Sequence, residues 1–204
     1  MRYLAVTILS VIFVSACNQV KNNHRLPFYG NHDFIEGDTI YYTPGDFKLL
    51  NQDSIVVTPA SLEGKIYVTD FFFTSCPSIC PKMKTQLLRV YDKIEKDNDV
   101  IIVSHTIDPE HDNVEVLNTF ASNLGVASSH WQFLTGERDS IYALAKTYMV
   151  IANEDVDAPG GFAHSGAFLL LDKSRRIRGV YDGTEKDQVD LLLNDIDLLR
   201  KEYE

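Results

Sequence analysis

Residues 66–83, IYVTDFFFTSCPSICPKM, decide the fold of this chain. The first half is rich in β-branched and aromatic residues, as expected of a buried strand, and residues 74–77 break that pattern. From Met83 onward, apolar residues recur at helical spacing. The stretch therefore predicts a strand, a short turn and a helix, and the turn carries Cys76 and Cys80.

Two cysteines at the start of a helix have special chemistry. The free N–H groups and the dipole of a helix N-terminus favour negative charge, so thiolates form there more easily than in water. Pro81 fits the first helical turn, and Pro77 biases Cys76 toward an extended backbone. If the intervening residues are helical, the two side chains lie on one face, roughly 5–6 Å apart at Cβ. Such a pair can form a disulfide after a small adjustment, or it can hold one metal ion.

Length and charge narrow the function classes. The 204 residues suit one domain of ordinary size plus appendages. The formal net charge is −10 and no basic patch offsets it, which argues against a nucleic-acid partner. The sequence also contains no glycine-rich phosphate-binding motif. It shows no set of a nucleophile, a general base and a residue that orients the base, of the kind that would suggest hydrolysis.

The first residues have the form of a bacterial lipoprotein signal. One Arg precedes an apolar run that is short for a membrane span, and the ending VSAC resembles a lipobox. We predict a signal peptide over residues 1–16 and a lipid on Cys17, with an ordinary signal peptide as the alternative. Lipidation also accounts for the odd number of cysteines. Residues 17–40 then form a lipidated N-terminus and polar tether, and the protein is anchored in the cell envelope, facing the periplasm or extracytoplasmic side.

The remaining sequence, residues 41–204, predicts one α/β domain. Before residue 66, two short strands around a turn predict an N-terminal hairpin at residues 46–50 and 54–57. After the first helix, the expected elements are strands at 100–107 and 131–134, helices at 113–124 and 137–148, an irregular loop at 153–161, a hairpin of 168–172 with 177–181, and a helix at 185–203. This order, with a Cys pair at the first strand–helix turn, favours a thioredoxin-like fold with a short N-terminal β-hairpin and a loop insertion before the last hairpin.

Four motifs occur in a telling order: TDFFFTSCPSICP, TIDPEHD, LTG and HSGAFLLLD. Together they resemble the SCO/SenC family of copper-binding proteins that assist assembly of cytochrome c oxidase. The resemblance runs from about residue 46 to the C-terminus, and it implies that Cys76, Cys80 and His164 are copper ligands. It implies Cu(I), with Cu(II) as a second state, and the copper-bearing oxidase subunit as partner. Other copper chaperones or thiol reductases are further candidate partners.

The sequence departs from the family pattern at two places. The family commonly has Asp immediately before the ligand histidine, where it is associated with support of that histidine and with partner contact, and this chain has Ala163. The family's Asp-Pro loop often carries Arg where this chain has His111. Asp108 and His111 are therefore a candidate partner loop, and for His105 and His111 we favour loop and partner-contact roles over a metal pair.

The chemistry of the three candidate ligands agrees with the resemblance. Two thiolates and one imidazole form a soft, low-coordinate set that suits Cu(I), whereas structural zinc normally takes four protein ligands. Taken alone, the cysteines would also fit a plain disulfide, and His164 would fit an ordinary loop histidine. We predict a metallochaperone rather than an enzyme. A thiol–disulfide oxidoreductase that keeps the oxidase cysteines reduced, and a copper or redox sensor, are the alternatives.

Overall fold

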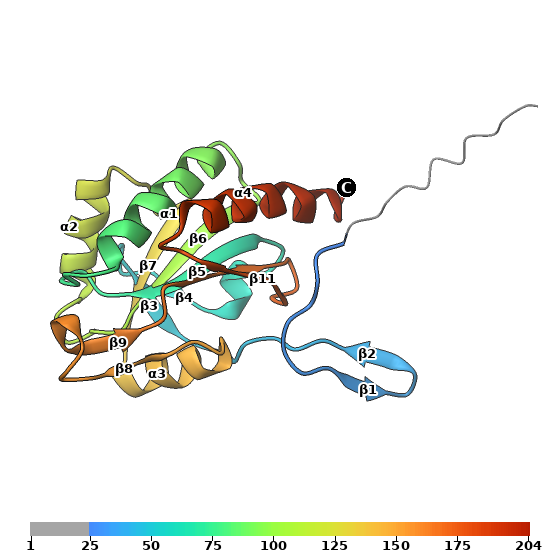
Figure 1. Cartoon of the computed structure of the whole chain (residues 1–204), viewed down its shortest axis with the longest axis horizontal. Coiled ribbons are helices and arrows are strands. Elements are labelled where there is room, and N and C mark those ends of the chain that lie inside the picture. The colour runs from blue at the N-terminus through green and yellow to red at the C-terminus, as the bar shows by residue number, and fades with distance from the viewer. Residues whose placement is uncertain (1–24) are drawn as a thin grey trace, which may run out of the picture.

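The computed structural model describes residues 25–204; the predicted signal peptide and Cys17 lie outside these residues. A seven-stranded sheet runs through the molecule in the order β11-β10-β5-β6-β7-β3-β4 (Figure 1). Its strands are β3 Leu49–Asn51, β4 Val56–Val57, β5 Ile66–Phe72, β6 Val100–Thr106, β7 Trp131–Thr135, β10 Ala167–Leu171 and β11 Ile177–Asp182. The predicted element order is confirmed, including the N-terminal hairpin, which β3 and β4 form.

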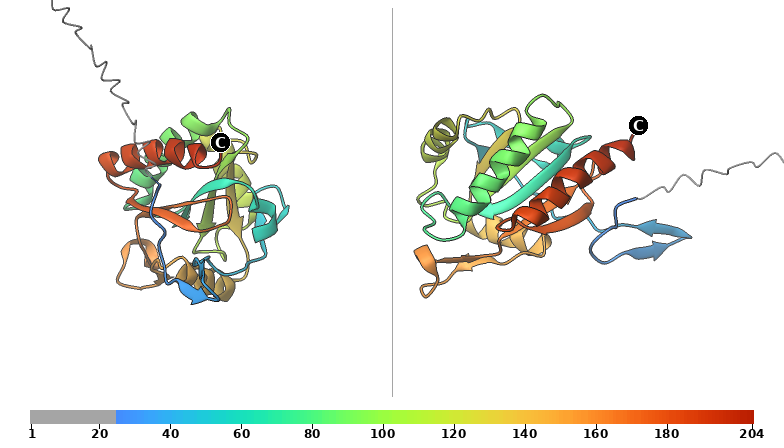
Figure 2. Two further views of the ribbon diagram at one scale, coloured as in Figure 1. Left: turned by 90° about the vertical axis from the view of Figure 1, so that its right-hand side faces the viewer. Right: turned by 45° about the horizontal axis from the view of Figure 1, so that its top comes forward.

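Helices cover both faces of the sheet. Those on one face are α1 Cys80–Ile94, α2 Val114–Leu124 and α4 Lys186–Lys201, and α3 Arg138–Thr147 covers the other. Figure 2 shows α1 and α4 side by side, where the ion pair of Lys93 with Asp197 joins them. Every residue of β5 and β6 is buried, which explains the nearly continuous apolar run of the central strand. Within residues 25–204, no helix is both long and apolar enough to cross a bilayer.

Local signals set both ends of α2 where the sequence predicted them. The Asn113 side chain accepts a hydrogen bond from the Val116 amide at 3.1 Å and so caps the start of α2. Gly125 ends the same helix in the left-handed conformation, with φ of 71°. Both residues act within one turn of the helix end that they cap, so their effect can be read from the sequence.

The folded part begins earlier than Tyr41, which corrects the predicted tether of residues 17–40. Leu26 packs into the core, and the buried Arg178 guanidinium donates to the Leu26 and Pro27 carbonyls at 2.7 and 3.0 Å. Farther along, β1 Asp33–Ile35 and β2 Asp38–Ile40 pair as a hairpin that projects from the body (Figure 1). Nothing in the local pattern marks this start, because the bonds that hold it come from a residue 151 and 152 positions away.

A second small hairpin replaces part of the predicted irregular loop at residues 153–161. β8 Ala152–Glu154 pairs with β9 Phe162–His164, and the 3₁₀ turn Pro159–Gly161 lies between them. This strand pair is separate from the seven-stranded sheet. Its importance is that β9 carries His164.

His105 is a core residue, and the predicted loop or partner-contact role is wrong. It lies within β6, where it is fully buried and stacks on Phe71 with ring centroids 4.9 Å apart. Nδ1 lies 3.2 Å from the Thr69 hydroxyl oxygen, and Nε2 has no hydrogen-bond partner among residues 25–204. Burial lowers the pKa of His105 to about 4, because a charged imidazole is poorly solvated there.

Replacement of His105 by Phe should make the fold less sensitive to acid. An unfolded histidine titrates near pH 6.5, whereas the folded pKa is about 4. The unfolded chain therefore binds a proton that the native state does not. The stability that the neutral His105 contributes is fully present above pH 6.5 and falls as the pH drops toward 4, by on the order of 3 kcal/mol.

Urea denaturation of the native protein and of His105→Phe at about pH 4.5 and 7.5 measures this effect. Lowering the pH should reduce the free energy of unfolding less in the variant than in the native protein. The other titratable groups are present in both proteins, so their effects cancel in the comparison. A difference that does not change with pH would contradict a buried, neutral His105.

Candidate metal centre

The cysteine turn lies beyond the carboxyl end of β5. After Phe72, the last residue of that strand, the Cys76 amide donates to the Phe73 carbonyl at 3.3 Å and closes a turn. Helix α1 then begins at Cys80, with Pro81 in its first turn, as predicted. Residues 77–79 are not helical, so only Cys80 belongs to the helix. Cys76 is 8% exposed and Cys80 is half-buried.

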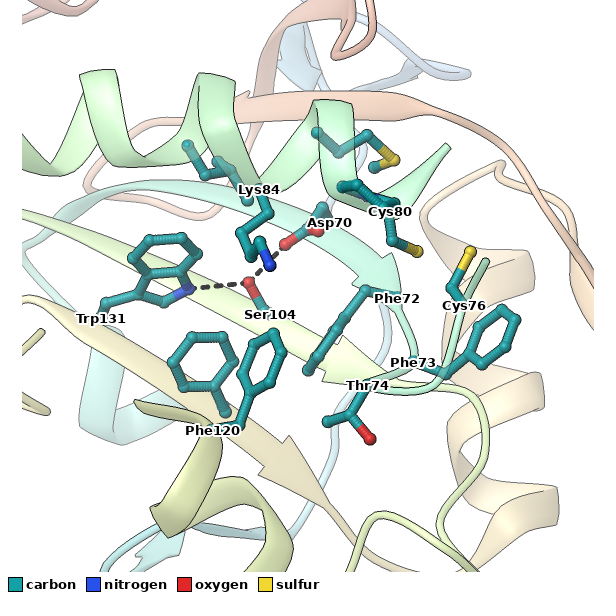
Figure 3. A pocket seen from close by; sticks show the side chains of 14 residues that line it. Asp70, Phe72, Phe73, Thr74, Cys76, Cys80, Lys84, Ser104, Phe120 and Trp131 are labelled. Atoms are coloured by element: carbon teal, nitrogen blue, oxygen red, sulfur yellow. Dashed lines mark hydrogen bonds between the residues drawn. The ribbon is translucent and has the colours of Figure 1, made fainter. Parts of the chain in front are cut away.

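Three side chains that the sequence singled out meet at this turn. The His164 Nε2 atom lies 3.3 Å from the Cys80 sulfur and 3.9 Å from the Cys76 sulfur. Their ligand atoms all lie within 4.8 Å of one another, and neither thiol is in a disulfide. Figure 3 shows the two sulfurs pointing toward each other, one from the turn and one from the helix. Within residues 25–204 this is the one cluster of three or more side chains that could hold a metal ion.

The small hairpin is seated against the cysteine turn by close packing. The Phe73 ring lies 5.1 Å from the ring of Phe162 and meets that of His164 edge-on at 5.7 Å. Gly160 lies against the same ring, with φ of +81°; a Cβ there would lie 2.9 Å from Phe73 Cε2 and 3.1 Å from Pro77 Cδ. The absence of a side chain at Gly160 therefore lets β9 approach closely enough to place His164 beside the sulfurs.

The two thiols differ in acidity. Burial alone would raise the pKa of Cys76, but hydrogen bonds from the Cys80 thiol and from the Ser78 and Cys80 amides lower it overall. For Cys80, burial raises the pKa, and the hydrogen bond with Cys76 and the charge of Asp70 add to the effect. The predicted stabilisation of thiolates thus holds for Cys76 and not for Cys80. Cys76 is the thiolate that forms first.

His164 is available as a neutral ligand at physiological pH. Burial lowers its pKa, because a charged imidazole is poorly solvated there. While Nε2 faces the sulfurs, Nδ1 is buried without a hydrogen-bond partner in the described chain, and so is the Ser165 hydroxyl. Ala163 offers no carboxylate that would bind Nδ1. The ring is therefore held by packing rather than by a hydrogen bond on its far side.

A small cavity of about 50 Å³ lies behind the cysteines, with room for a few water molecules (Figure 3). At its deep end the Ser104 hydroxyl donates to Asp70 and accepts from Trp131 Nε1 at 2.9 Å. Burial raises the pKa of Asp70 to about 7, and the Ser104 hydrogen bond opposes that shift. Asp70 is not among the predicted site residues, although a single acid within an apolar strand was the available signal.

The predicted partner loop lies next to the cysteine turn. His111 is exposed, and its Nδ1 atom lies 2.9 Å from Asp112 Oδ1 and 3.4 Å from the Thr74 hydroxyl. The hydrogen bond to Asp112 raises the pKa of His111. Asp108 is partly buried in the same loop. The structure brings this loop to the site, and its contact with a partner stays a prediction.

Comparison with known proteins gives one consistent result. Residues 38–197 match the SCO1/SenC family. A SCO1/SenC family lipoprotein from Bacillus anthracis is 26% identical with a TM-score of 0.71, over 78% of this chain and 95% of that one. BsSco, of the Sco family of cytochrome c oxidase assembly proteins, is 30% identical with a TM-score of 0.68, over 78% of this chain and 93% of that one. Copper-bound Arabidopsis thaliana ScoI is 28% identical with a TM-score of 0.65, over 78% of this chain and 99% of that one. The predicted thioredoxin-like fold class is confirmed.

Gly160→Ala should weaken Cu(I) binding about tenfold or more, because the new Cβ would push β9, and with it His164, away from Phe73. Gly161→Ala is the matched control: its φ of +85° imposes the same backbone strain, but nothing lies within 4 Å of its Cβ. A Cu(I) competition titration against a chromophoric chelator measures both. Equal affinities of the two variants would contradict the packing role of Gly160.

Proposed function

The chain belongs to the SCO1/SenC family, and we propose that it is a copper metallochaperone for a respiratory cytochrome c oxidase. It binds Cu(I) through Cys76, Cys80 and His164 and delivers the ion to the copper-bearing subunit. The observation that carries this proposal is the convergence of two sulfurs and one imidazole nitrogen within 4.8 Å. The copper-bound structure of a similar protein supports it.

The donor set favours Cu(I) on chemical grounds. Thiolates are soft ligands that prefer Cu(I), and three protein donors are fewer than structural zinc normally takes. Burial lowers the pKa of His164 and hydrogen bonds lower that of Cys76, and both shifts favour the deprotonated forms that bind a metal. Cu(II) is the second state we propose for the same site.

The surroundings of the site suit transfer to another protein. Ser75, Pro77 and Ser78 are exposed, so ligands of a recipient can approach the sulfurs from outside. The loop of Asp108 and His111 lies beside this opening and is the surface we propose for partner contact. In this function the chain holds and passes on a metal ion, so it is not an enzyme.

Thiol–disulfide exchange is the second candidate function. Two free cysteines with neighbouring sulfurs and unequal acidity can reduce a disulfide in a partner: the Cys76 thiolate attacks, and Cys80 then closes the internal disulfide. The partner leaves as a dithiol, so electrons and protons balance. Thiol reductases would then return the pair to the reduced state, and other copper chaperones are candidate donors of the metal. A copper or redox sensor would use the same residues through a different partner.

His164→Ala should separate the two functions. Loss of the third donor should weaken Cu(I) binding by about tenfold or more, whereas disulfide formation needs only Cys76 and Cys80. His130→Ala is the control, because this residue precedes β7 at the opposite end of the sheet from the site. A Cu(I) competition titration and a disulfide redox titration are run on each protein. Native affinity in His164→Ala would remove His164 from the ligand set and place thiol exchange first.

We also propose that Cys17 carries a lipid and that residues 1–16 are removed as a signal peptide, which anchors the domain outside the cytoplasm. A similar protein, from Bacillus anthracis, is described as a lipoprotein. Arg178 holds the start of the folded chain next to Ile177 of β11. Ile177 pairs with Leu171 of β10, and Leu171 pairs with Tyr67 near the amino end of β5. The start of the folded chain therefore lies near the amino end of β5. The metal centre lies beyond the other end of that strand, about 20 Å away.

We propose that this arrangement orients the domain on the membrane. The chain between Cys17 and Leu26 spans at most about 30 Å when fully extended. Because it joins the domain at the end opposite the site, the cysteines and His164 point away from the bilayer, where an extracytoplasmic partner domain can reach them.

Cys17→Ser should move the protein from the membrane to the soluble fraction or stall its processing, because the acyl chains that anchor it are lost. Cys80→Ser is the control and should stay in the membrane fraction. Cell fractionation with intact-mass spectrometry of the native chain provides the measurement. A native mature chain without lipid mass, recovered in the soluble fraction, would refute the anchor.

A further inference from the structure

A buried carboxylate joins the cysteine turn to the end of β6. The Asp112 side chain is fully buried and accepts hydrogen bonds from four groups. These are the Thr74 amide at 2.9 Å, the Thr74 hydroxyl, the Thr106 hydroxyl at 2.6 Å and His111 Nδ1 at 2.9 Å. Two of the four come from Thr74, in the turn that leads to Cys76.

We propose that Asp112 is a positioning residue of the metal centre. It touches neither sulfur; it fixes Thr74 at both the backbone and the side chain, and so sets where the Cys76 sulfur lies relative to Cys80. This inference rests on the proposed copper-binding function for its metal readout only, since the position of a thiol can also be measured without metal.

The position of Thr74 in the chain makes this bond effective. Phe73, the residue before Thr74, accepts a hydrogen bond from the Cys76 amide, and its ring packs on that of His164. Cys76 follows two positions after Thr74. Residues 73–79 form no helix or strand. The turn therefore depends on bonds to its surroundings, and Asp112 provides two of them.

The scaffold on the other side is firm. The Ile107 amide donates to the Phe72 carbonyl at 2.8 Å, so the ends of β5 and β6 are joined next to the turn. The Asp112 amide donates to the Asp108 carbonyl at 2.8 Å, and the Asp108 amide donates to the Thr106 hydroxyl at 3.1 Å. Asp112 thus has a fixed place from which to hold Thr74.

The histidine side of the centre has no equivalent support. His164 belongs to a hairpin outside the main sheet, and its Nδ1 atom has no hydrogen-bond partner among residues 25–204. Hydrogen bonds to a charged, buried acceptor are stronger than those between neutral groups. Pre-organisation of the ligand set therefore comes from the cysteine side, through Asp112 and Thr74.

Two matched substitutions separate positioning from general stability. Thr74→Val removes a hydroxyl that donates to Asp112, and Thr69→Val removes a buried hydroxyl that donates to the Val103 carbonyl; each keeps a similar side-chain shape. Thr74 lies in the cysteine turn, whereas Thr69 lies within β5 and bonds to neither Asp112 nor Thr74 among the described residues. If Asp112 positions Cys76, only Thr74→Val should disturb the centre, although both variants should lose stability. Thr74→Ser keeps the hydroxyl and should behave like the native protein.

The experiment has two readouts on the full-length protein and its variants. The first is the rate at which iodoacetamide alkylates Cys76 in reduced, metal-free protein, with the alkylated residue identified by peptide mass spectrometry. The second is Cu(I) affinity by competition titration. Thr74→Val should change the alkylation rate several-fold and weaken Cu(I) binding about tenfold. Thr69→Val should stay within about threefold of the native protein in both.

The outcomes distinguish this inference from the proposed function. Equal effects of Thr74→Val and Thr69→Val, or native behaviour of Thr74→Val in both readouts, would overturn the positioning role of Asp112. A native protein that binds no Cu(I) would overturn the proposed function, while the alkylation rates would still decide the role of Asp112.

Discussion

The parallel pairing of β5 with β6 is the constraint on which the rest of the site depends. Its register places Phe72 opposite Thr106 at the carboxyl end of the sheet. Because both strands end there, the cysteine turn and the loop of residues 107–112 leave the sheet side by side, and Asp112 can bond to Thr74. Both strands are buried on both faces, so a slip of one residue would turn every side chain to the wrong layer.

The centre combines ligands with different kinds of support. Cys80 is fixed by the first turn of α1, and Cys76 by a turn that is bonded to the end of β6. His164 comes from a small hairpin that packs through Phe162 and Gly160 against Phe73. The centre therefore has two firmly held sulfurs and one imidazole that is held by packing alone.

Two buried ionisable groups in the central strands have opposite pKa shifts with one cause. Burial raises the pKa of Asp70 to about 7 and lowers that of His105 to about 4, because each charged form loses its hydration. Between these values both groups favour the neutral state. The sheet therefore contains two polar side chains within strands that the sequence presents as nearly continuous apolar runs, and each is accommodated by a neighbouring hydroxyl, Ser104 or Thr69.

The sequence by itself determined the strand, turn and helix around Cys76 and Cys80, the order of the elements and the ends of α2. These features depend on periodicity, proline placement and capping, which act over a few residues. The place of His164 was available only from a family resemblance, since it lies 88 positions from Cys76. Only the tertiary structure decided the bond of Asp112 to Thr74, the burial of His105 and the early start of the fold at Leu26. Each depends on strand register or on contacts between distant segments, and no local pattern encodes those distances.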